Sequence, residues 1–351
     1  MAASNPQLPD HEFTEEIPFE SILSMLADES NTFPARELIR FSGLEGQELQ
    51  DFTQTWSGIS GQLKTGILED LELLSEGDTV FDFDQIAAVG LNESDEKIRQ
   101  LAIRNLWQTE DPALLPKLVE VFQEDESPAV RAQAAQVLGR FLYLGEVGRI
   151  KKEAKQLSEN ALFGAMDSEQ IDEVRQRTLE ALAYSSDGRL DGLIEDAYDF
   201  GEEDWQAAAL FAMGRSADNR WVPTILERLE DPNADLVREA ARAAGGLEIE
   251  EAIPSLLNLL YDEIREVRLA AAWSLSQIGG DAAAESLDEY LERAEDDDEV
   301  DLIEDAIDNL AFNLELDELN LLDYSKEELE QLTKPEELED DENISPNPPE
   351  A

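Results

Sequence analysis

The amino-acid sequence predicts an all-α protein whose helices form an α-α superhelix, a solenoid of about eight helical pairs. Three observations predict this fold. Apolar residues recur at the three- and four-residue steps of amphipathic helices. These helices come in pairs joined by acidic turns, and the pairs repeat roughly every 30 to 36 residues along most of the 351-residue chain. A repeat of this length with two helices per unit is typical of an α-solenoid.

The clearest helical pair lies within residues 253–280. Its first helix carries apolar residues on one face of a 3.6-residue period, namely Ile253, Leu256, Leu257 and Leu260. In its second helix Val267, Ala271 and Leu275 follow at four-residue steps, and Gly279 and Gly280 supply the stop. A lone pair of this size leaves apolar stripes exposed, so neighbouring pairs are needed to cover them.

Each second helix opens with a hydrophobic residue, called the anchor here, and a basic residue follows it. The pattern is Ile98-Arg99, Val130-Arg131, Val174-Arg175, Val237-Arg238 and Val267-Arg268, with looser versions at Leu63-Lys64 and Trp205-Gln206. The last unit is degenerate, because its anchor is Val300 or Ile303 and an acid follows in both registers. Small or apolar residues stand four and eight positions after the anchors, which places one buried stripe on every second helix.

The acidic turns before the anchors, together with the Val-Arg step, resemble HEAT repeats. The resemblance is closest to the short bacterial form called HEAT-like repeats of the phycobilisome lyase type. The turn acids are Asp125 before Val130, Asp231 and Asp235 before Val237, and Asp262 before Val267. The resemblance covers roughly residues 45–313. It implies a right-handed superhelix whose second helices line a concave surface, and a ladder in which each turn Asp meets the Arg of an adjacent unit.

The composition predicts three parts along the chain. Residues 1–32 mix Pro, Asn, Glu and Ser, and we interpret them as a flexible acidic arm. Residues 33–313 form the HEAT-like α-solenoid, with its first and last units as degenerate caps. Residues 314–351 are rich in Asp, Glu and Pro, which predicts an acidic, largely disordered tail.

The chain is strongly acidic, with 83 Asp and Glu against 26 Lys and Arg and a net charge of −57. One interpretation is a surface adapted for solubility, in keeping with a salty habitat. The other is electrostatic recruitment of a basic partner. Nucleic acid is disfavoured under both, because neutralising phosphates requires Lys and Arg.

The composition also indicates the cellular compartment in which we expect the protein. The chain has no cysteine, so neither a disulfide framework nor a thiolate metal site is expected. No basic residue precedes Arg36, and no apolar run is long enough to span a bilayer. We therefore expect a cytoplasmic, monomeric protein without membrane insertion.

Catalytic residue patterns are missing from the sequence. The diiron hydroxylases with this repeat hold iron through several His-Glu pairs, whereas this chain has one histidine, His11, in the predicted arm. HEAT-like DNA glycosylases need a basic concave face, which the acidic composition does not supply. We expect no cofactor and no enzymatic activity, and instead a scaffold or adaptor that binds another protein on its concave face. The alternative is a bilin lyase-like or cofactor-chaperone activity, because ligand counting does not exclude the phycobilin lyase branch.

One insertion interrupts the repeat near residues 144–159, where consecutive anchors lie 44 residues apart. It contains the chain's basic cluster, formed by Arg149, Lys151, Lys152 and Lys155. These side chains either balance nearby glutamates on an extended first helix or mark a docking point for the partner.

Two Gly-Arg steps with neighbouring aromatic residues suggest a second set of binding residues. Gly139-Arg140 is followed by Tyr143, and Gly214-Arg215 is followed by Trp221. If each glycine ends its helix, the arginines and aromatics lie along one rim of the concave face, and Arg and aromatic residues are enriched in binding hot spots. The alternative is that each Arg bonds the exposed carbonyls of its helix end.

Two further tryptophans, Trp107 and Trp273, fall outside the buried column. They are either exposed on the concave surface or packed between repeats. The partner-binding candidates are therefore Trp107, Arg140, Tyr143, Arg149, Lys151, Lys152, Lys155, Arg215, Trp221 and Trp273.

Overall fold

The computed structural model describes residues 17–28, 30–77, 80–294 and 296–318, and all regular secondary structure in these residues is helical. The helices α2 to α17 form eight helical pairs in this part of the chain. The prediction of an all-α repeat fold with about eight pairs is confirmed. The chain divides into two compact units, residues 1–249 and 250–351.

The first unit contains six helical pairs, preceded by α1 (Phe19–Ala27) and the 3-10 helix η1 (Ala35–Phe41). Its first helices are α2 (Gly46–Trp56), α4 (Asp84–Gly90), α6 (Leu115–Glu124), α8 (Lys152–Ser168), α10 (Arg189–Phe200) and α12 (Val222–Arg228). Its second helices are α3 (Gly61–Gly77), α5 (Glu96–Arg104), α7 (Pro128–Glu146), α9 (Asp172–Leu182), α11 (Glu203–Arg215) and α13 (Ala234–Gly246). The 3-10 turns η2 (Pro112–Leu114) and η3 (Asn219–Trp221) lead into α6 and α12.

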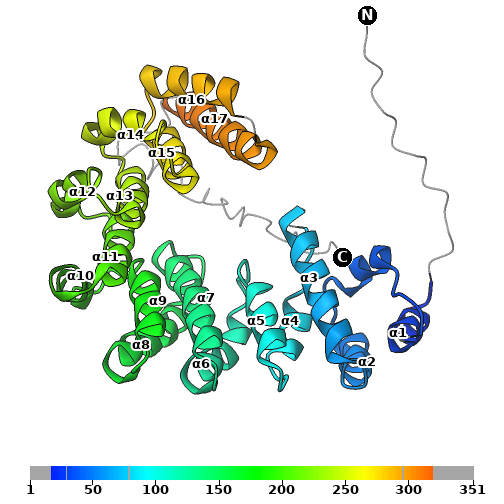
Figure 1. Ribbon diagram of the computed structural model, residues 1–351. Helices are drawn as coiled ribbons and strands as arrows, with labels where there is room; N and C mark the ends of the chain where they lie inside the picture. The colour runs from blue at the N-terminus through cyan, green and yellow to red at the C-terminus, as the bar shows by residue number, and fades with distance from the viewer. Residues whose placement is uncertain (1–16, 29, 78–79, 295, 319–351) are drawn as a thin grey trace, which may run out of the picture. The chain divides into compact units, whose positions relative to one another are not determined.

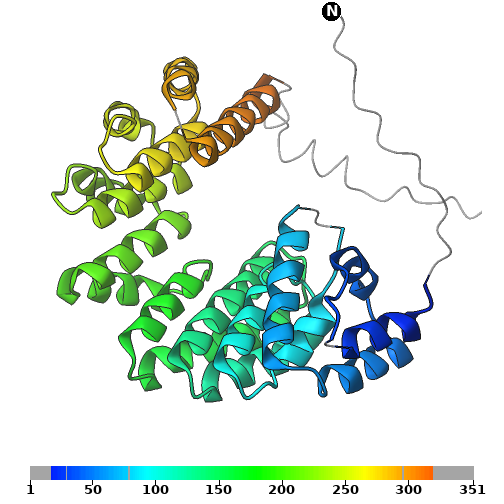
Figure 2. The same ribbon diagram turned by 45° about the vertical axis from the view of Figure 1, so that its right-hand side comes forward.

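Helices of the first unit form two layers. The second helices pack on one another in sequence order, and the first helices cover them from one side (Figures 1 and 2). Thus α7 packs on α5 and α9, and α11 packs on α9 and α13. Each later first helix packs on its own second helix, as α6 does on α7 and α8 on α9. The second helices therefore share one open face in this unit.

The second unit repeats the arrangement with two pairs. It comprises the 3-10 turn η4 (Glu250–Ala252), α14 (Ile253–Leu259), α15 (Arg265–Ile278), α16 (Asp281–Arg293) and α17 (Asp297–Glu318). Here α15 packs on α14 and α17, and α16 packs on α17.

The starts of several second helices are fixed by local sequence. Asp95 caps α5 by accepting a hydrogen bond from the Lys97 N–H at 2.9 Å. Asn233 caps α13 in the same way through the Asp235 N–H, also at 2.9 Å. Side-chain oxygens at these positions satisfy N–H groups that have no partner within the helix. The turn chemistry therefore fixes where α5 and α13 begin, and with it the register of Ile98 and Val237.

Most of the anchor column is buried as predicted, whereas the looser anchors Leu63 and Trp205 are half-buried. Ile98, Val130, Val174 and Val267 are at most 1% exposed. The residues four positions later are fully buried: Ala102, Ala134, Thr178, Ala209, Ala241 and Ala271. In α17 Ile303 is buried and Val300 is half-buried, which selects Ile303 as the anchor of the last unit. Small residues in this column let neighbouring second helices approach closely.

The two glycines that we expected to end helices do not end them. Gly139 lies inside α7, and Gly214 is the penultimate residue of α11. A Cβ on Gly139 would stand 2.9 Å from the Cα of Ala181, and one on Gly214 would stand 2.8 Å from the Cβ of Ala243. These glycines are therefore packing residues, because the next second helix leaves no room for a side chain.

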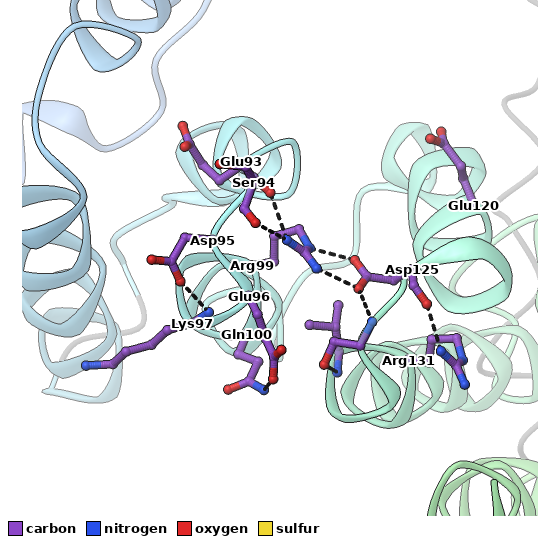
Figure 3. A network of polar contacts seen from close by, with 12 residues as sticks. Glu93, Ser94, Asp95, Glu96, Lys97, Arg99, Gln100, Glu120, Asp125 and Arg131 are labelled. Carbon is purple, nitrogen blue, oxygen red and sulfur yellow. Dashed lines mark hydrogen bonds and ion pairs between the residues drawn. The ribbon is translucent and has the colours of Figure 1, made fainter.

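The ladder that the resemblance implied is present at Asp125. Figure 3 shows the Arg99 guanidinium bonded to both carboxylate oxygens of Asp125 in the following unit, at 2.7 and 2.8 Å. The same guanidinium also donates to the backbone carbonyls of Glu93 and Ser94 in its own turn. One arginine thus connects two successive turns through a bidentate ion pair.

Other connections of this kind use glutamates in place of the turn aspartates. Arg131 pairs with Glu169 at 2.8 Å, Lys64 with Glu93 at 2.8 Å, and Arg268 with Glu299 at 2.7 Å. Arg131 and Arg268 also donate to backbone carbonyls six residues earlier in their own turns. We call these three connections, together with Arg99–Asp125, the ladder.

Ladder carboxylates are stabilised in their charged form. Burial alone raises the pKa of Asp125, but hydrogen bonds from Arg99 and the Ser127 N–H outweigh it, so its pKa lies below the ordinary value. The same balance with Arg131 lowers the pKa of Glu169.

Asp231, Asp235 and Asp262 do not form the predicted connection. Asp231 pairs with Arg228 of its own unit at 2.5 Å, because Gln206 replaces the arginine in the preceding unit. Asp235 pairs with Arg238 on its own helix, and Asp262 accepts the Ile264 N–H at 2.8 Å.

The helices at the two ends of the described chain differ from the predicted domain boundaries. We expected residues 1–32 to be a flexible arm, but α1 forms within them and buries Ile22, Leu23 and Leu26 as it packs on α2. The short apolar run is amphipathic, and α2 supplies the surface that covers it. Residues 314–318, which we expected in the disordered tail, continue α17 instead. Residues 1–16 and 319–351, the latter being the rest of the predicted tail, lie outside the described residues. No helix in the described part is both long and apolar enough to cross a bilayer.

Candidate partner-binding groove

Four neighbouring second helices of the first unit border a groove of about 760 Å³. Its lining comes from α7, α9, α11 and α13, together with Tyr184 in the turn after α9. This position agrees with the expectation that second helices line a hollow face. The lining is mainly polar, with five carboxylates and three arginines, and includes the small residues Ala181, Ala207 and Ala208.

One edge of the groove is acidic. Glu173, Asp204 and Asp235 lie in the first turns of α9, α11 and α13, and all three are exposed. Carboxylates are favourable there because the N-terminal end of a helix carries partial positive charge. The repeat places one such acid in the first turn of three successive second helices, so the three carboxylates lie along the same edge of the groove.

The floor of the groove contains a buried carboxylate on α13. Glu239 is 7% exposed, and its Oε1 accepts hydrogen bonds from Arg238 Nε and Arg242 Nη1, each at 3.0 Å. Its Oε2 is buried and has no hydrogen-bond partner among the described residues. Such an oxygen is costly, because it has lost water without gaining a donor.

A second carboxylate of the floor comes from α9. Arg177 Nη1 donates to both carboxylate oxygens of Glu180 at 2.6 Å. The pKa of Glu180 is nevertheless raised, chiefly by burial and further by the charge of Glu239 across the groove. The two acids therefore repel each other, although three arginines lie beside them in the floor.

The opposite edge carries aromatic rings and an arginine. The ring of Tyr143 at the end of α7 meets Tyr184 edge-on, with centroids 5.6 Å apart. The Arg215 guanidinium at the end of α11 lies 6.0 Å from the Tyr184 ring and 5.6 Å from Phe211. Arg215 is exposed, so its guanidinium is held by cation–π contacts while remaining open to solvent. Tyr184 and Phe211 also line the groove, so edge and groove are continuous.

Of the predicted rim residues, Tyr143 and Arg215 are thus brought together, and Tyr184 is the residue that connects them. Arg140 belongs elsewhere, because it lies inside α7 and pairs with Glu110 at 2.9 Å. Trp221 was expected at the rim, but it is 8% exposed, in the turn that leads into α12. Its ring is buried within the protein, so it is not available to a partner.

Two of the four basic residues of the insertion, Arg149 and Lys155, pair with acids. The extra residues lengthen α7 and α8 to 19 and 17 residues rather than forming a loop. Lys155 pairs with Glu146 at 2.7 Å and with Glu159 at 3.8 Å, which matches the interpretation of an extended helix with balanced charges. Arg149 shares Glu110 with Arg140.

The remaining candidates are separate from the groove. Lys151 and Lys152 are exposed at the start of α8. Trp107 is 48% exposed after α5, and Trp273 is 45% exposed on α15 of the second unit, so neither is fully packed between repeats. None of the four lines the groove.

Sequence reasoning missed the acids and arginines of the floor. A signal was available for Glu239, because it stands two residues after its anchor, where the other fully formed anchors have Gln100, Ala132, Gln176 and Leu269. No comparable signal marks Tyr184, whose role depends on two other helices.

The fold and the groove define this chain as an α-helical repeat protein with an open face on its second helices. A family model described as HEAT repeats matches residues 87–183, 187–263 and 222–308. The chain belongs to the HEAT-repeat family, as the sequence pattern had indicated. A search of curated proteins finds no match.

Solved structures with similar folds come from proteins of different activities. The CpcE–CpcF complex of phycocyanin lyase from Nostoc is 20% identical, with 65% of this chain and 94% of that chain covered and a TM-score of 0.41. Human deoxyhypusine hydroxylase in complex with glycerol is 18% identical, with coverages of 84% and 96% and a TM-score of 0.33. An engineered protein is 16% identical, with coverages of 84% and 88% and a TM-score of 0.37. Likeness at this level concerns the fold alone.

Proposed function

We propose that this protein is a non-catalytic scaffold that holds a segment of another protein in the groove between α7 and α13. The observation that carries the proposal is the groove itself, which four successive second helices line with polar side chains and two half-buried aromatic rings. Arginine and aromatic side chains are the types that contribute most to protein interfaces. Arg215, Tyr143 and Tyr184 supply them at one edge.

The character of the lining favours a protein segment over a small molecule. Small-molecule sites are mostly apolar and enclose their ligand. This groove is open along the repeat and lined largely by charged side chains. An extended or helical segment can contact several successive helices at once, which is how repeat proteins use their open faces.

The proposal predicts that filling the groove removes partner binding. Ala207 lines the groove on α11 and is half-buried, so Ala207→Trp places an indole in the groove without breaking an ion pair. Leu269→Trp is the matched control, because Leu269 stands at the same distance from its anchor on α15 and is also half-buried.

Tagged wild type and both variants would be used to capture proteins from a lysate of the source organism, followed by mass spectrometry. We expect one or more proteins to be captured by wild type and Leu269→Trp, and at least tenfold less of them by Ala207→Trp. Equal capture by the two variants would refute a role for the groove. A purified wild type with tetrapyrrole absorbance would refute the non-catalytic scaffold in favour of a bilin-handling protein.

A further inference from the structure

The feature of the groove that the scaffold role leaves unexplained is the free oxygen of Glu239. Its side chain is 9% exposed, and both arginine donors reach the same oxygen, Oε1. Oε2 is left without a donor in the part of the chain that the structure describes. A carboxylate buried to this extent is stable only when its remaining lone pairs are satisfied.

The charges around this oxygen select the kind of donor. The three arginines of the groove are already paired, Arg177 with Glu180, Arg238 with Asp235 and Glu239, and Arg242 with Glu239. Glu173 and Asp204 at the acidic edge form none of the ion pairs found within the described residues. An arriving cation therefore meets two exposed carboxylates that have no cation of their own, and one buried oxygen of Glu239 that no donor of the described residues reaches.

We propose that the groove receives a basic segment of the partner protein, and that one Lys or Arg side chain of this segment donates to Glu239 Oε2. Further Lys or Arg residues of the segment lie along the acidic edge of Glu173, Asp204 and Asp235. The proposal rests on the scaffold function and names the chemistry of its partner. A cation at Glu239 also weakens its repulsion of Glu180, which adds to the effect of burial in raising the pKa of Glu180.

The overall acidity of the chain does not distinguish the groove from the rest of the surface, because a net charge of −57 attracts any basic peptide. What distinguishes the groove is a buried oxygen that lacks a donor. The test must therefore compare acids that carry equal charge but differ in position.

The probe is a fluorescein-labelled peptide of twelve residues, acetylated and amidated, made of Lys and Ala. Its binding to the full chain would be measured by fluorescence anisotropy at pH 7.5 in 0.15 M salt. Glu239→Gln keeps an acceptor for Arg238 and Arg242 but loses the charge at Oε2. Glu266→Gln removes one exposed acid in the first turn of α15 and changes the net charge equally.

We expect Glu239→Gln to weaken peptide binding at least tenfold, and Glu266→Gln to stay within twofold of wild type. An equal change in the two variants would show diffuse attraction to an acidic surface and would overturn the proposal. So would unchanged binding by Glu239→Gln, because the peptide would then bind without depending on Oε2. A peptide of Glu and Ala that binds as well as the Lys peptide would overturn it too.

Circular dichroism and thermal unfolding would detect misfolding of Glu239→Gln. A second variant tests the proposal independently of whether Glu239→Gln folds. Glu173→Gln combined with Asp204→Asn changes only exposed side chains of the acidic edge. We expect it to weaken the Lys peptide at least threefold relative to Glu263→Gln combined with Glu266→Gln, which removes two exposed acids elsewhere and changes the net charge equally. The absence of a difference would count against the proposal even where Glu239→Gln fails to fold.

Capture from the lysate separates this proposal from the scaffold function. If Ala207→Trp loses the captured protein while Glu239→Gln retains it, the groove binds a partner but the basic segment is refuted. If Ala207→Trp retains the protein, the scaffold function itself is refuted. Loss in both variants, together with the peptide result, supports both proposals.

Discussion

The ladder and the groove use the same repeat position in opposite ways. In the ladder, Arg99 and Arg131 follow their anchors and reach an acid of the next unit, with side chains only 12 and 13% exposed. At the groove, Arg175 and Arg238 stand at the same position but pair with Asp172 and Asp235 on their own helices. Arg175 also stacks on Trp205 of the next unit, with its guanidinium carbon 5.1 Å from the ring.

This difference separates holding repeats in register from presenting a surface. Buried bidentate pairs fix two turns relative to each other and leave no charge for a partner. Where the arginine turns back onto its own helix, acids such as Glu173 and Asp204 stay exposed. At the groove, α11 and α13 are held by close helix packing through Gly214 instead. One repeat thus supplies a structural connection in one region and a binding surface in another.

The largest expected effect comes from breaking a ladder connection. Arg99→Ala leaves Asp125 with a side chain 7% exposed and without its cation. Removing one partner of a buried pair costs about 3 kcal/mol of unfolding free energy or more. Urea unfolding followed by circular dichroism measures this loss.

The matched change at the groove is Arg242→Ala. Arg242 is 53% exposed, and Arg238 still donates to Glu239, so the loss should stay below about 1 kcal/mol. Equal losses in the two variants would remove the distinction between ladder and groove.

A smaller effect is expected from crowding the helices at the groove. Gly214→Ala places a methyl group against Ala243 of α13, and such overpacking costs about 2 kcal/mol. Gly164→Ala is the control, because that position on α8 has no neighbour within 4 Å and alanine favours a helix. We expect thermal unfolding to show a lower midpoint for Gly214→Ala and an unchanged or higher one for Gly164→Ala. A stable Gly214→Ala variant would contradict the role of close packing.

The smallest effect concerns Asp84, an acid at the start of α4 that no cation pairs with directly. Burial raises its pKa to about 6, against a hydrogen bond from Thr109 that lowers it, and Asp82 and Asp111 add to the rise. The folded state therefore holds a proton that the unfolded state releases near pH 4. The stability that this bound proton contributes is fully present below about pH 4, and it is lost as the pH rises through about 6.

Asp84→Asn should accordingly stabilise the protein above pH 6, because the neutral amide avoids the cost of a half-buried charge. Allowing for partial exposure, we expect a gain of about 1 kcal/mol at pH 8 and a smaller one at pH 5. Urea unfolding at both values measures it. A gain that is the same at pH 5 and pH 8 would show that the charge of Asp84 is not its cause.

Much of the fold could be predicted because the same spacing of apolar residues and the same turn residues recur in most of the helical pairs. The spacing of Val267, Ala271 and Leu275 is sufficient to define a helix face, and all three residues are buried. The prediction failed at Gly139 and Gly214, since glycine ends a helix in one context and admits a close neighbour in another. Only the position of the next helix decides between the two.

For the site, the sequence supplied Tyr143 and Arg215 but not Tyr184, whose ring contacts both of them. Tyr184 and Glu239 belong to the groove only because α7, α9, α11 and α13 lie side by side. Trp221 shows the reverse, since a residue type typical of interfaces is used in the core.

The sequence by itself determined that this protein is a chain of helical pairs, because helix periodicity, turn acids and anchors are local and are repeated. Only the tertiary structure decided which arginines connect successive turns, which glycines separate helices and which acids face the groove. The physical reason is that pairing and burial depend on neighbours that lie about thirty residues away in the chain.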